Sequence, residues 1–132
     1  MEALRAVSFA VMAVLTKLAA EHDLSLTQLR MIGILRDRRL TITELATALG
    51  LDRSSVSGLV DRTEARGLVQ REPNPADARS TLVTLSSQGV DTLATGTTET
   101  ARQLASLTDG LTATEARRLT ALLDRMLEHR GL

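Results

Sequence analysis

The sequence predicts a mainly α-helical (α+β) protein: a winged helix-turn-helix with additional N- and C-terminal helices. Apolar residues recur at helical spacing along most of the 132 residues. Two short helical segments are joined by Gly50-Leu51-Asp52, which is typical of a helix-turn-helix. Two runs of β-formers then flank a loop with two prolines, which indicates one hairpin. Hydrophobic residues make up 43% of the chain, and the core they form must be aliphatic because Phe9 is the only aromatic residue.

The first helix is predicted over residues 4–20. Its main apolar stripe consists of Leu4, Val7, Val11, Val14, Leu15 and Leu18. Met12 adds a second stripe, so we expect this helix to pack on two surfaces. The apolar segment within it, residues 6–20, is interrupted by Ser8, Thr16 and Lys17 and lacks a cleavage pattern of small residues. It is judged too short and too interrupted to span a membrane, so we expect a soluble cytoplasmic protein with no membrane partner.

The second helix is predicted to begin at Leu26, with Ser25 or Thr27 as its cap, and to end at the charged group of residues 36–39. That group is interpreted as a solvated helix end, with a DNA contact as the alternative. After a brief extended piece, Thr43 is predicted to cap a short helix.

The third helix is predicted over residues 44–49, and Gly50 closes it. Asp52 is then predicted to cap a helix over residues 53–66, which Gly67 ends in the left-handed region. The buried positions of this fourth helix are predicted to be Val56, Leu59, Val60 and, more weakly, Thr63.

A hairpin is predicted from residues 68–71 and 81–85, with Pro73 and Pro75 in its loop. Ser86 or Ser87 then caps a long helical tract with poor helix propensity over its threonine-rich middle. Asp109-Gly110 breaks this tract, and a last helix follows. We expect four residues of the last helix to face inward: Leu119, Leu122, Leu123 and Met126.

The whole chain is predicted to be a single domain, 1–132, with residues 25–86 as its winged helix. The outer parts, 1–24 and 87–132, have apolar stripes with no partner inside that small module. A second copy of the chain related by a two-fold axis would cover them, so these parts are predicted to be dimerisation helices.

The sequence lacks the residue patterns that disulfides, metal sites and enzyme active sites require. The chain has no cysteine, which excludes disulfides and thiolate metal sites. Its two histidines, His22 and His129, have no metal-ligand spacing, so no metal site is expected. No nucleophile elbow, phosphate loop or paired carboxylates appear, so we expect neither an enzyme nor a cofactor. Net charge is zero, yet residues 26–85 carry nine arginines and seven carboxylates, a weak asymmetry in the direction expected for phosphate contact.

The segments LSLTQLRMIGIL (24–35) and LTITELATALGLDRSSVSGLVDRTEARGLVQREPNPADARSTLVTLSSQG (40–89) resemble the MarR family of bacterial transcription regulators. The most specific parts are the run from Leu45-Ala46 to Gly67-Leu68-Val69 (LA–LG–D–S–VS–LVD–E–GLV) and the pattern Asp77-x-Arg79 before Val83-x-Leu85. The resemblance implies a homodimer that binds pseudo-palindromic double-stranded DNA. Helix 53–66 would be the recognition helix in the major groove, and the hairpin, the wing, would insert Arg79 into the minor groove with Asp77 holding it. A narrow minor groove favours such a guanidinium.

The exposed face of helix 53–66 supports this interpretation, because serines can donate to phosphate or base edges and arginines can neutralise phosphate. The predicted DNA-binding residues are Thr43, Arg53, Ser54, Ser55, Ser57, Arg62, Asp77 and Arg79. Two alternatives stay open: the serines cap the helix, or Arg79 is an ordinary solvated loop arginine. Gly58 and Thr63 depart from the larger polar residue and the leucine that the family favours.

The resemblance also implies a repressor relieved by a small anionic or phenolic effector, bound between the outer helices and the winged helix. The predicted pocket residues are Phe9, Met12, Ala13, Thr16 and Met31. For Phe9 a core or dimer contact is the alternative, and for the methionines a place in the core. The rival function is a winged-helix protein-interaction module that has lost DNA binding. The sequence does not identify the operator, the regulated genes or the effector.

Overall fold

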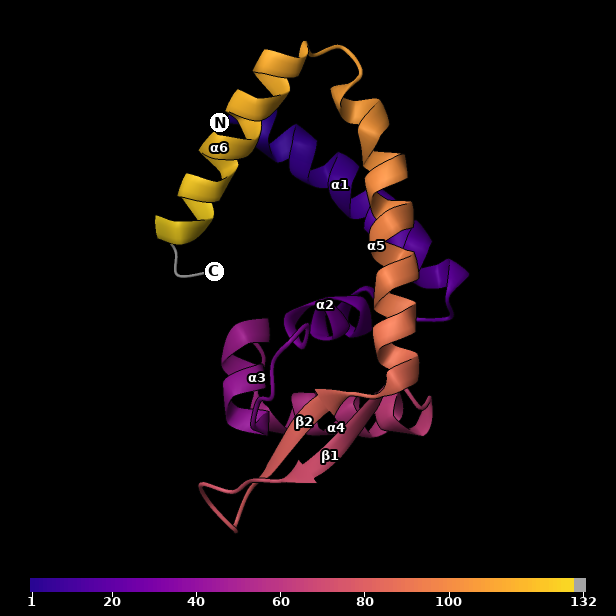
Figure 1. Ribbon diagram of the computed structural model, residues 1–132, viewed down its shortest axis with the longest axis vertical. Coiled ribbons are helices and arrows are strands. Elements are labelled where there is room, and N and C mark those ends of the chain that lie inside the picture. Colours follow the sequence, from indigo (N-terminus) through magenta and orange to yellow (C-terminus); the bar gives the residue numbers. More distant parts are fainter. Residues whose placement is uncertain (130–132) are drawn as a thin grey trace. The chain divides into compact units, whose positions relative to one another are not determined.

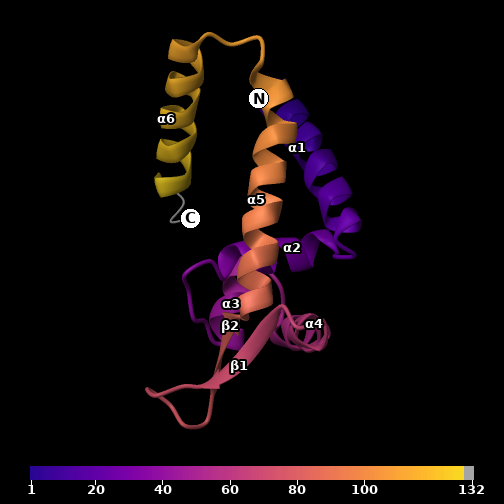
Figure 2. The ribbon, with the colours of Figure 1, turned by 45° about the vertical axis from the view of Figure 1, so that its right-hand side comes forward.

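The structure is a computed structural model that describes residues 1–129, and its elements follow the predicted order. The elements are α1 (Glu2–Glu21), α2 (Leu26–Ile34), α3 (Ile42–Leu49), α4 (Arg53–Ala65), β1 (Val69–Pro73), β2 (Thr81–Leu85), α5 (Ser87–Thr108) and α6 (Ala113–His129). The chain forms two compact units, which divide within α5 after Thr100. The first unit holds the predicted winged helix, with β1 and β2 running beside α4 (Figures 1 and 2).

Each helix of the winged helix begins at a side-chain cap. At the start of α2, the hydroxyl of Ser25 accepts from the N–H of Gln28 (3.1 Å), and the Gln28 side chain accepts from the N–H of Ser25 (2.9 Å). Thr41 and Glu44 form the same reciprocal pair at the start of α3. The prediction of Thr43 as the cap was therefore wrong, because Thr41 has the extended backbone that exposes its hydroxyl to the first turn.

The core of the winged helix is aliphatic, as predicted. It consists of Met31, Leu35, Leu45, Ala46, Leu49, Val56, Leu59, Val60, Val69 and Val83. Val56, Val60 and Thr63 have no exposed surface, which confirms the predicted inward face of α4. The fold thus uses one face of α4 for packing and leaves the other face to solvent.

A buried hydrogen bond explains why Thr63 is not leucine. Its hydroxyl donates to the carbonyl oxygen of Leu59 (2.8 Å) and accepts from the side-chain amide of Gln28 (3.2 Å). A leucine would leave that buried amide unsatisfied, which costs about 1–3 kcal/mol. The pair ties the start of α2 to the middle of α4.

The hairpin is antiparallel, with Val69 opposite Leu85 and Pro73 opposite Thr81. Pro73 was predicted in the loop, but it is the last residue of β1, a strand end that proline tolerates. The extended piece before α3 makes a single bridge between Leu40 and Val83, with hydrogen bonds of 2.7 and 3.2 Å. This bridge joins the hairpin to the α2–α3 connection.

Within the first unit, α5 is fastened at several points. The hydroxyl of Ser86 accepts from the N–H of Gly89 (3.0 Å), which confirms Ser86 as the cap. Gly89 packs so closely that a Cβ there would lie 2.0 Å from the carbonyl oxygen of Leu68. Farther along, Arg36 donates to the hydroxyl of Thr97 (2.7 Å). The threonine-rich stretch does not interrupt α5, because these contacts offset its poor propensity.

Helix α1 is longer and more apolar than the prediction assumed. It covers 20 residues, and it is long and apolar enough to cross a membrane by length and composition. The judgement that the segment is too short and too interrupted was therefore wrong. In the first unit only Leu18 and Ala19 of this helix are buried. The α1–α2 corner is held by Arg66, whose guanidinium donates to the carbonyl oxygens of His22 (3.1 Å) and Asp23.

The second unit contains the end of α5 and α6. Thr112 and Glu115 form a capping box at the start of α6. No described residue of α6 is buried. Leu119, Leu122 and Leu123 are 39–45% exposed, so the four residues predicted to face inward form an exposed apolar stripe.

Candidate nucleic-acid interface

The start of α4 is organised around Asp52. Its carboxylate accepts from the hydroxyls of Ser54 (2.6 Å) and Ser55 (2.7 Å) and from the N–H of Ser55 (2.8 Å). These donors, the Ser54 hydroxyl first, lower the pKa of Asp52 well below its ordinary value. Asp52 is therefore the ionised cap that the sequence predicts, and capping engages two of the three serines.

The same hydrogen bonds decide what the serines can offer to a ligand. A hydroxyl that donates its proton to a carboxylate presents only acceptor lone pairs to other groups. In the major groove, the donors that such oxygens can accept from are the amino groups of adenine and cytosine. Ser54 and Ser55 are exposed, whereas Ser57 is half-buried.

Gly58 lies next to the end of the Arg62 side chain. A Cβ at position 58 would lie 3.3 Å from an Nη atom of Arg62, so the glycine lets this guanidinium lie over the helix surface. Glycine at position 58 therefore removes the larger polar side chain that the family favours there, and it leaves room for the guanidinium of Arg62.

Asp61 has a cationic partner that the sequence analysis did not find. Arg71 of β1 donates to Asp61 (2.6 Å, Nη2 to Oδ1) and to Glu64. The Asp61 hydrogen bond is the largest cause that raises the pKa of Arg71 above its ordinary value, against a smaller effect of burial. Strand alternation could have revealed the contact, because Arg71 shares a face with the buried Val69.

The wing loop is shaped by short polar turns. Asn74 accepts from the N–H of Ala76 (3.0 Å) and donates to the hydroxyl of Ser80 (2.8 Å). The carboxylate of Asp77 accepts from the backbone N–H of Arg79 (2.9 Å). The predicted pair between Asp77 and the Arg79 guanidinium is not formed, because the carboxylate closes the turn instead. Arg79 itself is exposed.

Apart from Arg66, which holds the α1–α2 corner, the arginines near α4 and the wing fall into two groups. Arg39 pairs with Glu72 (3.1 Å), and Arg71 holds Asp61 and Glu64. By contrast, over residues 1–129 the guanidiniums of Arg53, Arg62 and Arg79 have no carboxylate partner. Thr43 is exposed on α3. The guanidiniums of Arg53, Arg62 and Arg79 can therefore bind an anion without first breaking an ion pair. The nearby carboxylates are already paired or hydrogen-bonded.

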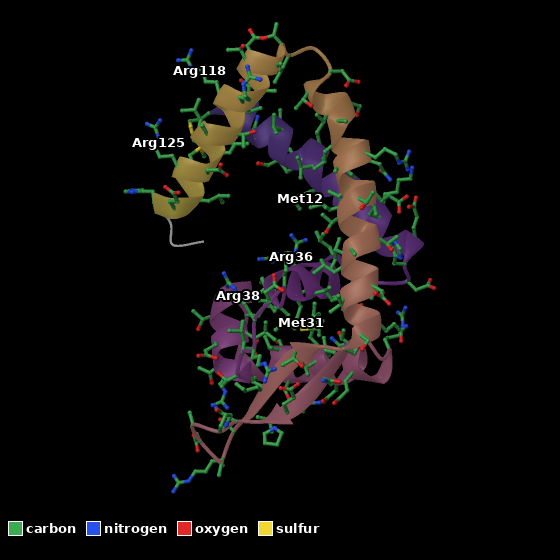
Figure 3. The ribbon with its side chains drawn as sticks, in the orientation of Figure 1. Met12, Met31, Arg36, Arg38, Arg118 and Arg125 are labelled. Atoms are coloured by element: carbon green, nitrogen blue, oxygen red, sulfur yellow. The ribbon has the colours of Figure 1, made fainter. Side chains whose placement is uncertain are left out.

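The predicted effector residues lie in different environments. Met31 is fully buried in the core of the winged helix. Phe9, Met12, Ala13 and Thr16 are exposed on α1, and Figure 3 shows Met12 and Met31 on their separate helices. The structure supports the core alternative for Met31, and the effector pocket stays a prediction.

Two comparisons of sequence agree with this geometry. A profile of the MarR family matches residues 22–80. The transcriptional repressor NicR of Pseudomonas putida is 36% identical over 86 residues, which cover 64% of this chain and 54% of NicR. The chain thus aligns with about half the length of that relative. The multiple antibiotic resistance protein MarR of Salmonella typhimurium is 31% identical over 107 residues, which cover 80% of this chain and 74% of that protein.

Solved structures agree as well. Apo MarR from Escherichia coli superposes with a TM-score of 0.82 at 26% identity, over 96% of this chain and 94% of that chain. BpsR from Bordetella bronchiseptica, whose DNA binding is regulated by 6-hydroxynicotinic acid, gives a TM-score of 0.73 at 25% identity, over 95% and 96% of the two chains. This chain therefore belongs to the MarR family of winged-helix, DNA-binding transcription regulators.

Proposed function

We propose that the protein is a homodimeric, sequence-specific repressor that binds a pseudo-palindromic operator. The observation that carries this proposal is the set of unpaired guanidiniums on the recognition helix, α4, and on the wing. Arg53 and Arg62 are placed to neutralise phosphates beside the major groove, and Arg79 to enter the minor groove. Arg71 offsets one of the two negative charges that Asp61 and Glu64 carry on α4.

Dimerisation is proposed from the exposed apolar residues outside the winged helix. Phe9 of α1 is 63% exposed, and Met126 of α6 is 49% exposed. Exposed apolar surface of this extent marks an interaction site in a soluble protein. We assign residues 1–24 and 87–132 to the dimer contact and residues 25–86 to DNA. In this arrangement the second subunit, and not a membrane, covers the apolar surface of α1. We therefore propose a cytoplasmic location.

Relief of repression by a small organic molecule is proposed by analogy with BpsR. A ligand that binds the outer helices more tightly in one dimer geometry would shift the separation of the two recognition helices. The exposed residues Phe9, Met12, Ala13 and Thr16 are the candidate ligand contacts.

The test is titration of the purified protein against the promoter region beside its own gene, over a range of salt concentrations. Four phosphate contacts, from Arg53 and Arg62 of two subunits, predict a slope of about −4 in log affinity against log salt, at roughly −0.9 per phosphate. Absence of salt-dependent binding to that region and to a pool of genomic fragments would favour the protein-interaction module instead.

A further inference from the structure

Arg71 joins the two elements that the proposed function places on DNA. Its side chain leaves β1, the first strand of the wing, and contacts two carboxylates one turn apart on α4. Arg71 is 28% exposed at the side chain, whereas Asp61 is 65% and Glu64 40% exposed. The guanidinium therefore lies against the helix, and its planar fork suits such bridging of two carboxylates.

The next residue of the same strand is fixed on the other side. Glu72 pairs with Arg39 of the α2–α3 connection (3.1 Å) and accepts from the hydroxyl of Thr84 (3.3 Å). Successive residues of a strand point to opposite faces. Arg71 and Glu72 thus hold the base of the wing from both faces, just before the loop that carries Arg79.

We propose that Arg71 is a positioning residue that fixes the wing to the recognition helix, so that Arg79 and α4 engage one duplex together. The inference rests on the proposed function. Without this tie, the wing must be ordered when DNA binds, and that ordering reduces what Arg79 contributes. Arg71 also offsets one of the two negative charges that Asp61 and Glu64 would otherwise present near phosphate.

The test is a double-mutant cycle measured by fluorescence anisotropy on an operator selected with the wild-type protein. Arg79→Ala should weaken binding of the wild-type protein at least about fivefold. In the Arg71→Gln background the same change should weaken binding about threefold or less, because the wing is already misplaced. Arg53→Ala is the matched control, since Arg53 lies on α4 itself and should lose the same factor in both backgrounds.

A second variant separates positioning from charge. Asp61→Ala/Glu64→Ala keeps Arg71 but removes its partners, so coupling to Arg79 should fall as in Arg71→Gln. Binding to non-operator DNA should strengthen in this variant and weaken in Arg71→Gln, because their net charges change in opposite directions. Thermal unfolding would show whether Arg71→Gln folds. If it does not, the Asp61→Ala/Glu64→Ala variant alone tests the coupling to Arg79.

Full and equal losses from Arg79→Ala in all backgrounds would overturn the positioning role while leaving the proposed function intact. If the wild-type protein binds no duplex, the proposed function and this inference fail together.

Discussion

Arg53, Arg62 and Arg79 are suited to phosphate because no carboxylate among the described residues pairs with them. The net charge of the chain is zero, so it gives no general attraction to DNA. An arginine that already holds a carboxylate must lose that pair before it can neutralise phosphate. Arg39 and Arg71 are in that position, and the three arginines proposed to contact DNA are not. The distribution of pairs therefore says more about binding than the count of charges.

Arg79→Ala is expected to weaken operator binding by about 1–3 kcal/mol, because the variant loses the contact assigned to the minor groove. Anisotropy titration at fixed salt measures the loss. Arg30→Ala, an exposed arginine outside the proposed interface, is the control and should bind as the wild type does. Equal affinities for the Arg79→Ala variant and the wild type would rule out the minor-groove role.

Asp52→Asn is expected to destabilise the fold in a pH-dependent way. The hydroxyls of Ser54 and Ser55 lower the pKa of Asp52 in the folded state, so this stabilisation is complete above the ordinary carboxyl pKa of about 4. It is lost as pH falls through the lower folded-state pKa. The stability difference between wild type and variant should therefore shrink below about pH 4, as urea unfolding at several pH values would measure.

Ser54→Ala/Ser55→Ala provides the matched comparison for Asp52. It removes the two hydroxyl donors and keeps the carboxylate, so it should remove much of the same acid-dependent stability. An acid response identical to that of the wild type would show that the hydroxyls do not hold the carboxylate in solution.

The helices and the hairpin follow from sequence patterns wherever apolar spacing and caps agree. The inward face of α4 was predicted because Val56, Leu59 and Val60 repeat at helical spacing. The start of α3 was misplaced because Thr41 and Thr43 are both good caps, and the choice depends on the backbone that Leu40 adopts when it bridges to Val83. At the candidate site, the exposed arginines were found from the sequence.

Pairings across elements were not found, because spacing within one element shows which face a residue shares but does not identify its partner on another element. Arg71 with Asp61 and Gln28 with Thr63 join residues of different elements, 10 and 35 positions apart in the sequence. The role of Asp77 was also misassigned, since the sequence does not show whether the carboxylate meets a side chain or a backbone N–H.

The packing of α5 on the winged helix predicts opposite effects for two glycines of the same helix. Gly89→Ala should destabilise the protein by at least about 2 kcal/mol, because its Cβ would collide with the backbone carbonyl of Leu68. Gly96→Ala meets no atom within 4 Å and should stabilise by roughly 0.5–1 kcal/mol through helix propensity. Denaturant unfolding of both variants is the measurement, and a stable Gly89→Ala protein would contradict this placement of α5.

The complete molecule is proposed to be a pair of chains, since the apolar stripes of α1 and α6 need a cover. α6 is the simpler case, because none of its described residues is buried and its apolar side chains lie along one stripe. Helices of this kind gain most of their stability from packing against a partner.

Leu123→Glu is expected to give monomers or insoluble protein, because the charge would lie in the proposed subunit contact. Light scattering coupled to size-exclusion chromatography would measure the mass. Arg117→Glu, on the opposite side of the same helix, should remain a dimer. A well-folded dimer of the Leu123→Glu variant would place the interface elsewhere.

Hydroxyl-radical footprinting on an operator selected with the wild-type protein tests the central claim most directly. Two chains with paired recognition helices predict two inverted protected half-sites, with centres about 10 bp or 34 Å apart. The minor groove beside each half-site should be protected by the wild type and open in the Arg79→Ala complex. A single protected half-site bound by one chain, with no minor-groove protection, would contradict the account.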